Sequence, residues 1–188
     1  MKYTIKEKKS LHEGFLNLYR TDVEFDSFDG EQEQRTFEVV DRGDSAAVVL
    51  YERDTNTMLL ANQFRVPTVE YSDGWVTELV AGRVEKGEDP ESAIRREVEE
   101  EIGYTLKDVK SIGSYVLSPG ACTERVFIYY ARVHSSDGPN DIHEGLAGED
   151  IKLIKLTMEH VEDLLNRGTI CDAKTVIGLK WFFDHAGK

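Results

Sequence analysis

Apolar and polar positions repeat with two different periods along the chain, and each period predicts a different kind of element. Residues 46–51 read AAVVLY, a continuous apolar run with the length of a buried strand. Ile94, Val98 and Ile102 recur at every fourth position, which places them on one face of a helix. The pattern also predicts strands at 58–64, 75–81, 110–117, 125–133 and 151–156, and helices at 158–167 and 173–185.

The order of these elements predicts an α+β fold in two parts. Residues 15–25 and 35–40 form an expected antiparallel hairpin, because polar and apolar residues mix along both and an Asp-Gly turn lies between them. We expect residues 1–43 to be an N-terminal β-sheet extension and residues 44–188 to be the main domain. Strands with segregated helices, and a loop at 134–149, indicate helices that cover a sheet.

The segment that carries the four-residue repeat has start and stop signals for a helix. The side chain of Asp89 can accept a hydrogen bond from an unpaired amide, and Pro90 suits the first helical position. Gly103 can adopt the left-handed conformation that ends a helix. We therefore expect a helix between Asp89 and Gly103.

Three glutamates lie along one side of this helix. A turn of about 100° per residue places Glu97 and Glu101 to one side of Val98, with Glu100 farther along that side. Like charges at this spacing repel one another, and more strongly beside a core, so a positive group is expected there. Carboxylate oxygens suit a hard divalent cation such as Mg²⁺ or Mn²⁺. Taken alone, the run Glu99 to Glu101 would instead indicate a solvated acidic face.

Composition narrows the classes of partner. The 188 residues suit one domain with a small extension, and a net charge of -13 argues against nucleic acid as the main partner. An anionic substrate would then be held by local arginines and metal. The apolar stretches are too short to span a membrane and the start resembles no signal peptide, so we expect a cytoplasmic protein. Cys122 and Cys171 lack zinc-ligand spacing.

The acidic helix lies inside a longer motif, GRVEKGEDPESAIRREVEEEIGY at residues 82–104. It follows the pattern G-x5-E-x7-R-E-U-x-E-E-x-G-U, where U is a bulky aliphatic residue, and the chain is therefore identified as a member of the Nudix hydrolase superfamily. Only Tyr104 departs from the pattern, at the last U. The matching positions are Gly82, Glu88, Arg96, Glu97, Val98, Glu100, Glu101 and Gly103. The resemblance implies the Nudix fold, an α/β/α sandwich with a mixed sheet.

Further segments resemble the ADP-ribose pyrophosphatase branch, which includes GDP-mannose and other nucleotide-sugar pyrophosphatases. They are NQFR at 62–65, ELVAG at 78–82, SPGACTE at 118–124 and GED at 148–150. The resemblance implies hydrolysis of the diphosphate bond of a nucleoside diphosphate sugar, with ADP-ribose as the expected substrate and GDP-mannose or another nucleotide sugar as the alternative. It also implies a homodimer in which the N-terminal sheets help to build the substrate clefts.

The same resemblance assigns roles to particular residues. The expected ligands of Mg²⁺ or Mn²⁺ are the Ala81 carbonyl and the carboxylates of Glu97, Glu100 and Glu101. Arg65 is expected to contact the diphosphate, or else to form a surface salt bridge. Glu124 is expected to hold a sugar hydroxyl, with Gly120 beside it in the same loop, or else to be an ordinary loop carboxylate. Arg96 and Glu88 are expected to be scaffold residues, with Arg96 bracing Glu100 or pinning the loop through Glu88.

Three glutamates remain alternatives for the general base. Relatives carry an acidic residue in the loop before the penultimate strand, where this chain has Glu149 and Glu144. Relatives often carry a second glutamate at the position of Ala147, and its loss leaves Glu100 of the helix as a third choice. Two other classes of function remain as alternatives: a Nudix-like sensor that binds its ligand without cleaving it, and a structural protein whose acidic helix packs on a basic partner.

Overall fold

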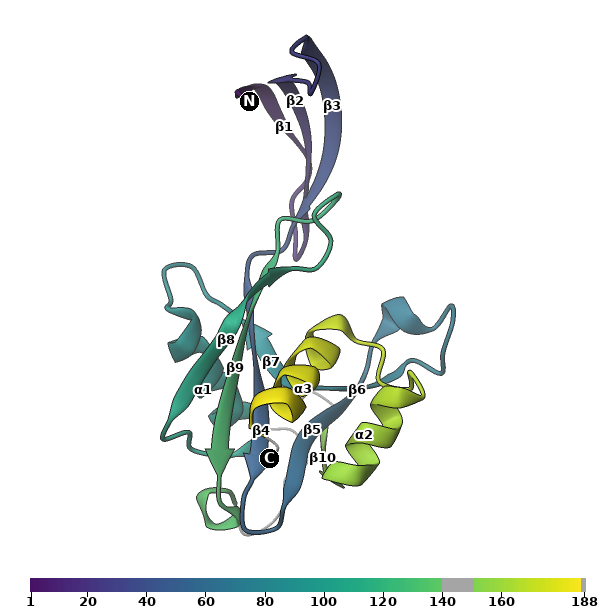
Figure 1. The fold of residues 1–188 in the computed structure, drawn as a ribbon. Coiled ribbons are helices and arrows are strands. Elements are labelled where there is room, and N and C mark those ends of the chain that lie inside the picture. The colour runs from purple at the N-terminus through teal and green to yellow at the C-terminus, as the bar shows by residue number, and fades with distance from the viewer. Residues whose placement is uncertain (140–150, 187–188) are drawn as a thin grey trace. The chain divides into compact units, whose positions relative to one another are not determined.

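The computed structural model describes residues 1–139 and 151–186 (Figure 1). Two compact units share the chain. The first contains Met1–Asp44 and Val116–Arg125, and the second contains Ser45–Tyr115 and Val126–Lys188. The segment Val116–Arg125 thus belongs with the N-terminal strands, an association that the order of elements in the sequence did not indicate.

The first unit is built on a three-stranded antiparallel sheet. Its strands are β1 (Tyr3–His12), β2 (Asn17–Asp26) and β3 (Gln32–Asp41), in the order β1-β2-β3. The hairpin of β2 and β3 was expected, but β1 was not, because its sequence YTIKEKKSLH is dominated by charged and polar residues. Within these three strands only Thr21 is buried, so this sheet has almost no core of its own.

The second unit contains a seven-stranded mixed sheet. Its strands are β4 (Ser45–Glu52), β5 (Thr57–Phe64), β6 (Trp75–Glu78), β7 (Val80–Arg83), β8 (Val109–Val116), β9 (Arg125–Val133) and β10 (Ile151–Thr157). The main order is β10-β5-β4-β9-β8, while β6 pairs with β5 and β7 pairs with β4. Strand β4 runs parallel to β9 and antiparallel to β5 and β7, which makes the sheet mixed, as expected.

Helices cover both faces of this sheet. They are α1 (Pro90–Ile102), α2 (Met158–Asn166) and α3 (Ala173–His185), with short 3-10 turns η1 (Val66–Thr68) and η2 (Ser135–Asp137). Alternate residues of β4 point to opposite faces of the sheet. Val48 and Leu50 share a buried cluster with residues of α1, and Val49 shares another with residues of α2 and α3. The second unit is therefore a three-layer sandwich, which confirms the expected α+β class.

The strand expected at 75–81 is divided into β6 and β7. At the break, the backbone N–H of Leu79 donates to the side-chain oxygen of Thr175, 2.9 Å away and fully buried in α3. A side chain distant in sequence thus replaces a strand partner, and the local pattern cannot reveal such a substitution.

Other expectations from composition can be compared with the described residues. Cys122 is half-buried and Cys171 is exposed, and both are free thiols. No helix within residues 1–139 and 151–186 has the length and apolar character needed to cross a membrane. The expected loop at 134–149 contains η2, and its remaining part beyond Pro139 lies outside the described residues.

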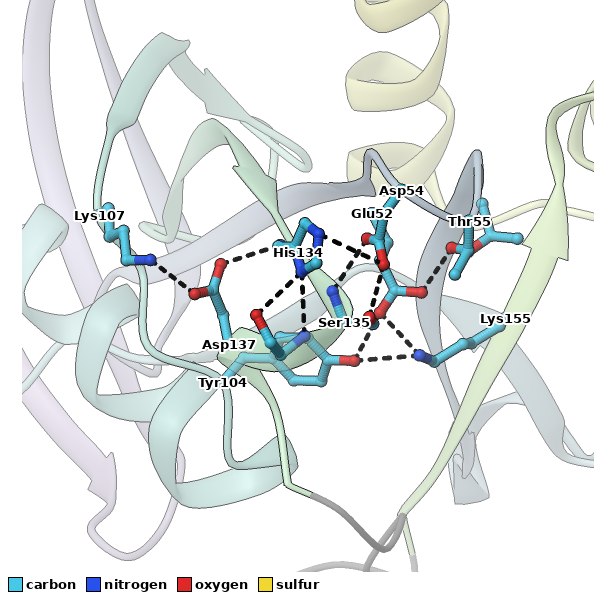
Figure 2. A network of polar contacts seen from close by, with 11 residues as sticks. Glu52, Asp54, Thr55, Tyr104, Lys107, His134, Ser135, Asp137 and Lys155 are labelled. Carbon is cyan, nitrogen blue, oxygen red and sulfur yellow. Dashed lines mark hydrogen bonds and ion pairs between the residues drawn. The ribbon is translucent and has the colours of Figure 1, made fainter.

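A buried polar network lies at the end of β4 and explains Tyr104, the one departure from the motif (Figure 2). The carboxylate of Glu52 has no exposed surface and accepts hydrogen bonds from the Tyr104 hydroxyl and the Lys155 ammonium, each at 2.7 Å. Thr55 donates to its second oxygen at 2.5 Å. An aliphatic residue at 104 would leave Glu52 with one donor fewer, so tyrosine suits this chain.

The network changes the protonation of its members. Burial alone would raise the pKa of Glu52, but hydrogen bonds from Lys155, Thr55 and Tyr104, with the charge of Lys155, outweigh it and lower that pKa. Burial and the hydrogen bond to Glu52 raise the pKa of Tyr104. For Lys155, the bonds to Glu52 and Tyr104 outweigh burial and raise its pKa. The carboxylate, the neutral phenol and the ammonium are therefore all favoured by folding.

We predict that Glu52→Gln lowers the free energy of unfolding at neutral pH by about 2–4 kcal/mol, because Lys155 loses its buried counter-charge. A carboxyl group whose pKa is lowered by folding stabilises the protein above its unfolded pKa, and this contribution is lost as pH falls through the folded pKa. Urea unfolding between neutral and acid pH should therefore show a smaller acid loss in the variant.

The control is Asp163→Asn, which removes the partner of Arg167 in an exposed pair of α2 and should cost less than about 1 kcal/mol. Equal acid dependence in the wild type and Glu52→Gln would contradict the role given to the network.

Candidate active site

The helix of the motif begins and ends as the sequence predicts. Asp89 caps α1 by accepting hydrogen bonds from the backbone N–H groups of Glu91 and Ser92, each at 3.1 Å, and Pro90 follows as the first helical residue. Gly103 ends the helix in the left-handed conformation, with φ of 70°. These caps and the buried face of α1 fix which side chains point away from the core.

Arg96 is the centre of the polar contacts on α1. Its guanidinium donates to both carboxylate oxygens of Glu88, at 3.1 and 3.2 Å, and to the carbonyl of Arg83, at 3.2 Å. One terminal nitrogen also donates to Glu97 at 2.9 Å and to Glu100 at 3.0 Å. Both scaffold roles expected for Arg96 are therefore present together: it braces Glu100 and pins the loop through Glu88.

The ionisation of these groups follows from the contacts. The pKa of Arg96 is raised, chiefly by its hydrogen bonds to Glu88 and also by those to Glu97 and Glu100. These contacts outweigh partial burial, which alone would lower that pKa. The hydrogen bond from Arg96 lowers the pKa of Glu88. The positive group that the acidic side of the helix requires is thus supplied in part by Arg96.

Gly82 provides the space in which the Glu97 carboxyl group lies. A Cβ atom at Gly82 would overlap the carboxyl carbon of Glu97, so no other residue fits without moving that side chain. Gly82 belongs to β7, opposite Ala46 of β4, and α1 packs against both strands. The Glu97 carboxyl group therefore lies against the backbone of β7 at Gly82. Gly82 directly follows Ala81, whose carbonyl is an expected metal ligand.

The three glutamates expected to bind metal all lie on α1. Glu97 and Glu100 meet at Arg96, with side chains 15% and 60% exposed, and Glu101 is half-buried on the same helix. Within residues 1–139 and 151–186, no three His, Cys, Asp or Glu side chains are arranged as a ready metal cluster. The donor set nevertheless fits a hard divalent ion, since it consists of carboxylate oxygens beside a glycine backbone.

Arg65, the expected diphosphate contact, is anchored on a buried carboxylate. Its Nε donates to Glu78 at 2.7 Å, and Lys174 of α3 bonds to the other oxygen of Glu78. The sequence patterns assigned no role to Glu78 or Lys174. The available signal was an acidic residue next to the apolar run LVA, which lies where a core is expected.

The remaining expected site residues belong to the first unit or fall outside the described residues. Glu124 and Gly120 belong to the first unit, where the Glu124 carboxylate pairs with Arg42 at 3.4 Å and an added Cβ at Gly120 would meet open space. Glu149 and Glu144, two of the expected alternatives for the base, lie outside the described residues.

Comparison with known proteins identifies the class. The family model described as NUDIX domain matches residues 41–175, and the chain belongs to this family of Nudix hydrolases. A GDP-mannose pyrophosphatase of Salmonella paratyphi B is 33% identical over 180 residues, covering 95% of this chain and 93% of that protein. A GDP-mannose pyrophosphatase of Yersinia enterocolitica is 32% identical over 173 residues, covering 91% and 90%.

The fold has a counterpart among solved structures. A crystal structure described as an ADP compounds hydrolase superposes with a TM-score of 0.76 at 20% sequence identity, and the match covers 100% of this chain and 98% of that one. This similarity confirms the Nudix fold expected from the motif.

We predict that Gly82→Ala weakens Mn²⁺ binding about 10- to 100-fold, because the added methyl group displaces the Glu97 carboxyl group without removing it. Electron paramagnetic resonance titration of Mn²⁺ measures the affinity, and circular dichroism checks the fold. Glu99→Gln removes an exposed carboxylate of the same helix and should leave the affinity unchanged. A folded Gly82→Ala protein with wild-type affinity would rule out Glu97 as a ligand.

Proposed function

We propose that this protein hydrolyses the diphosphate bond of a nucleoside diphosphate sugar, in a metal-dependent reaction that yields a nucleoside monophosphate and a sugar phosphate. The observation that carries the proposal is the arrangement of Glu97 and Glu100 around Arg96, with Glu97 seated against Gly82. Family membership supports the reaction class.

GDP-mannose is the substrate we place first. The relatives named GDP-mannose pyrophosphatase match 91% to 95% of the chain, and so support the alternative drawn from the sequence. ADP-ribose, the substrate expected from the sequence, is the second candidate, and the similarity to an ADP compounds hydrolase supports it.

The metal is assigned to four positions and would be Mg²⁺ or Mn²⁺. The ligands are the Ala81 carbonyl and the carboxylates of Glu97, Glu100 and Glu101. When bound, divalent ions neutralise diphosphate oxygens and lower the pKa of the attacking water. The protein's own part is to hold these oxygens ready: Arg96 fixes two of the carboxylates, and the Gly82 backbone leaves room for one of them.

Arg65 is assigned to the diphosphate. Its backbone N–H donates to the Gly74 carbonyl at 2.7 Å and its side chain is 43% exposed, so the guanidinium is anchored yet accessible. A planar fork of donors suits phosphate oxygens.

Glu124 and Gly120 are assigned to the sugar. Glu149, Glu144 and Glu100 remain the alternatives for the base, and the cytoplasmic location expected from the sequence stays a prediction.

A substrate panel tests the reaction. We expect GDP-mannose to be hydrolysed fastest among GDP-mannose, ADP-ribose and UDP-glucose, only with added Mg²⁺ or Mn²⁺, with phosphatase-coupled phosphate release as the assay. Glu101→Gln should lower turnover at least about 100-fold, because one metal ligand loses its charge, while thermal unfolding stays near that of the wild type. Binding of a nucleotide sugar without turnover in the wild type would overturn the proposal and favour a sensor.

The first unit supports the homodimer implied by the resemblance. Strand register places Tyr3 opposite Phe25, Ile5 opposite Val23 and Phe37 opposite Thr21, so apolar side chains gather on one face of the three-stranded sheet. Tyr3, Ile5 and Phe37 are all exposed in the single chain. A face of this kind needs a cover, and a second copy of the chain is the cover we propose.

We predict that light scattering after gel filtration gives a mass near 42.8 kDa (2 × 21.4 kDa) for the wild type. The double variant Ile5→Lys, Phe37→Lys should shift it toward the single-chain mass, because two charges would be buried in the contact. Thr4→Lys, on the opposite face of β1 and paired with Glu24, serves as the control. A wild-type mass near 21.4 kDa would refute the dimer.

A further inference from the structure

Glu78 is a buried carboxylate held between two cations from distant parts of the chain. Its side chain is only 4% exposed at the end of β6, where one oxygen accepts from Arg65 and the other from Lys174. Arg65 follows β5, and Lys174 lies in the first turn of α3, 96 positions away from Glu78. A buried anion of this kind is stable only while its partners remain in place.

Lys174 is itself fixed by the start of α3. Its ammonium also pairs with Asp172 at 3.0 Å, and Asp172 caps the helix by accepting from the Thr175 backbone N–H, also at 3.0 Å. Thr175 in turn accepts the hydrogen bond of Leu79, the residue after Glu78. The helix start and the end of β6 are therefore joined twice, once through charge and once through the backbone.

The two cations differ in exposure. The Lys174 side chain is 13% exposed and that of Arg65 is 43% exposed. Lys174 thus serves chiefly as an internal counter-charge, whereas Arg65 presents its guanidinium to solvent. Arg65 donates to Glu78 through Nε, so this hydrogen bond does not use the two terminal nitrogens of the guanidinium, which are also donors.

The same short segment also contacts α1. Glu78 begins the sequence ELVAG, and Gly82, which receives the Glu97 carboxyl group, ends it. A strand rises about 3.3 Å per residue, so the two ends lie within roughly 13 Å along the backbone. The anchor of Arg65 and the seat of the Glu97 carboxyl group therefore lie on one short segment.

We infer that Glu78 is a positioning residue: held by Lys174, it fixes the Arg65 guanidinium in the orientation that receives the diphosphate. This inference rests on the proposed function, because it assigns Arg65 to that diphosphate. Glu78 touches neither substrate nor metal in this role and acts only through Arg65. An unanchored Arg65 would keep its charge but would have to be ordered anew in each encounter with substrate.

A double-mutant cycle tests the relay. Glu78→Gln and Arg65→Ala should each lower kcat/KM for the nucleotide sugar by about 10- to 100-fold, since each removes a charge-assisted contact or its orientation. The double variant should be no worse than Arg65→Ala alone, because Glu78 has nothing left to position. Asp163→Asn, which removes the partner of the exposed Arg167 just after α2, should leave kcat/KM unchanged.

A further double variant serves as the control for loss of folding. Glu78→Gln leaves Lys174 with less counter-charge, so Glu78→Gln with Lys174→Met, which removes both buried charges, provides a version for use if the single variant unfolds. Its remaining turnover should be insensitive to a further Arg65→Ala change. Independent, multiplying losses for Glu78 and Arg65, or wild-type kcat/KM in folded Glu78→Gln, would overturn the inference.

Inorganic pyrophosphate separates this inference from the proposed function. If no nucleotide sugar is hydrolysed by the wild type, the proposed function fails, and calorimetric titration with pyrophosphate in Mg²⁺ buffer then provides the readout for the same cycle. Weaker binding in Glu78→Gln and Arg65→Ala, without a further loss in the double variant, supports the relay. Equal affinity in wild type, Glu78→Gln and Arg65→Ala overturns it.

Discussion

The interaction on which the site depends is the set of hydrogen bonds made by the Arg96 guanidinium. Four acidic side chains at fixed positions of the motif lie within one loop and one helix, and their repulsion opposes that arrangement. Arg96 binds Glu88, Glu97 and Glu100 and also the Arg83 carbonyl, so a single cation closes the loop onto the helix. The planar fork of arginine can make these contacts together, which the single ammonium of lysine cannot.

Local signals predicted most of the framework. Helix α1 was expected between Asp89 and Gly103 and lies there, because its caps and its apolar repeat are all contained in the same stretch. The bounds of α3 and β9 were also correct. Strand β1 and the break at Leu79 were missed because neither is determined by its own stretch of sequence. Strand β1 forms by pairing with β2, and the break depends on the hydrogen bond from Leu79 to Thr175. Contacts between distant positions leave no periodic trace.

The residues of the candidate site also differ in whether local sequence spacing could reveal them. The motif identified Arg96 and the carboxylates of α1, whose spacing is local, but not Glu78, whose partner Lys174 lies on another helix. Tyr104 shows the value of a departure from a pattern. Its hydroxyl completes the shell of donors around Glu52, so the missing aliphatic residue marked a buried polar group that no motif describes.

Charge pairing gives a physical reason for the metal in the reaction proposed above. The chain carries a net charge of -13, and the cations that hold the site together are already engaged: Arg96 with three carboxylates, and Arg65 and Lys174 with Glu78. A diphosphate therefore meets well-placed donors but little net positive charge, and the field of the whole chain repels it. Divalent ions bound to the α1 carboxylates would supply the missing charge where the diphosphate must lie. In the proposed reaction the arginines would therefore orient the diphosphate, and the metal would provide most of the attraction.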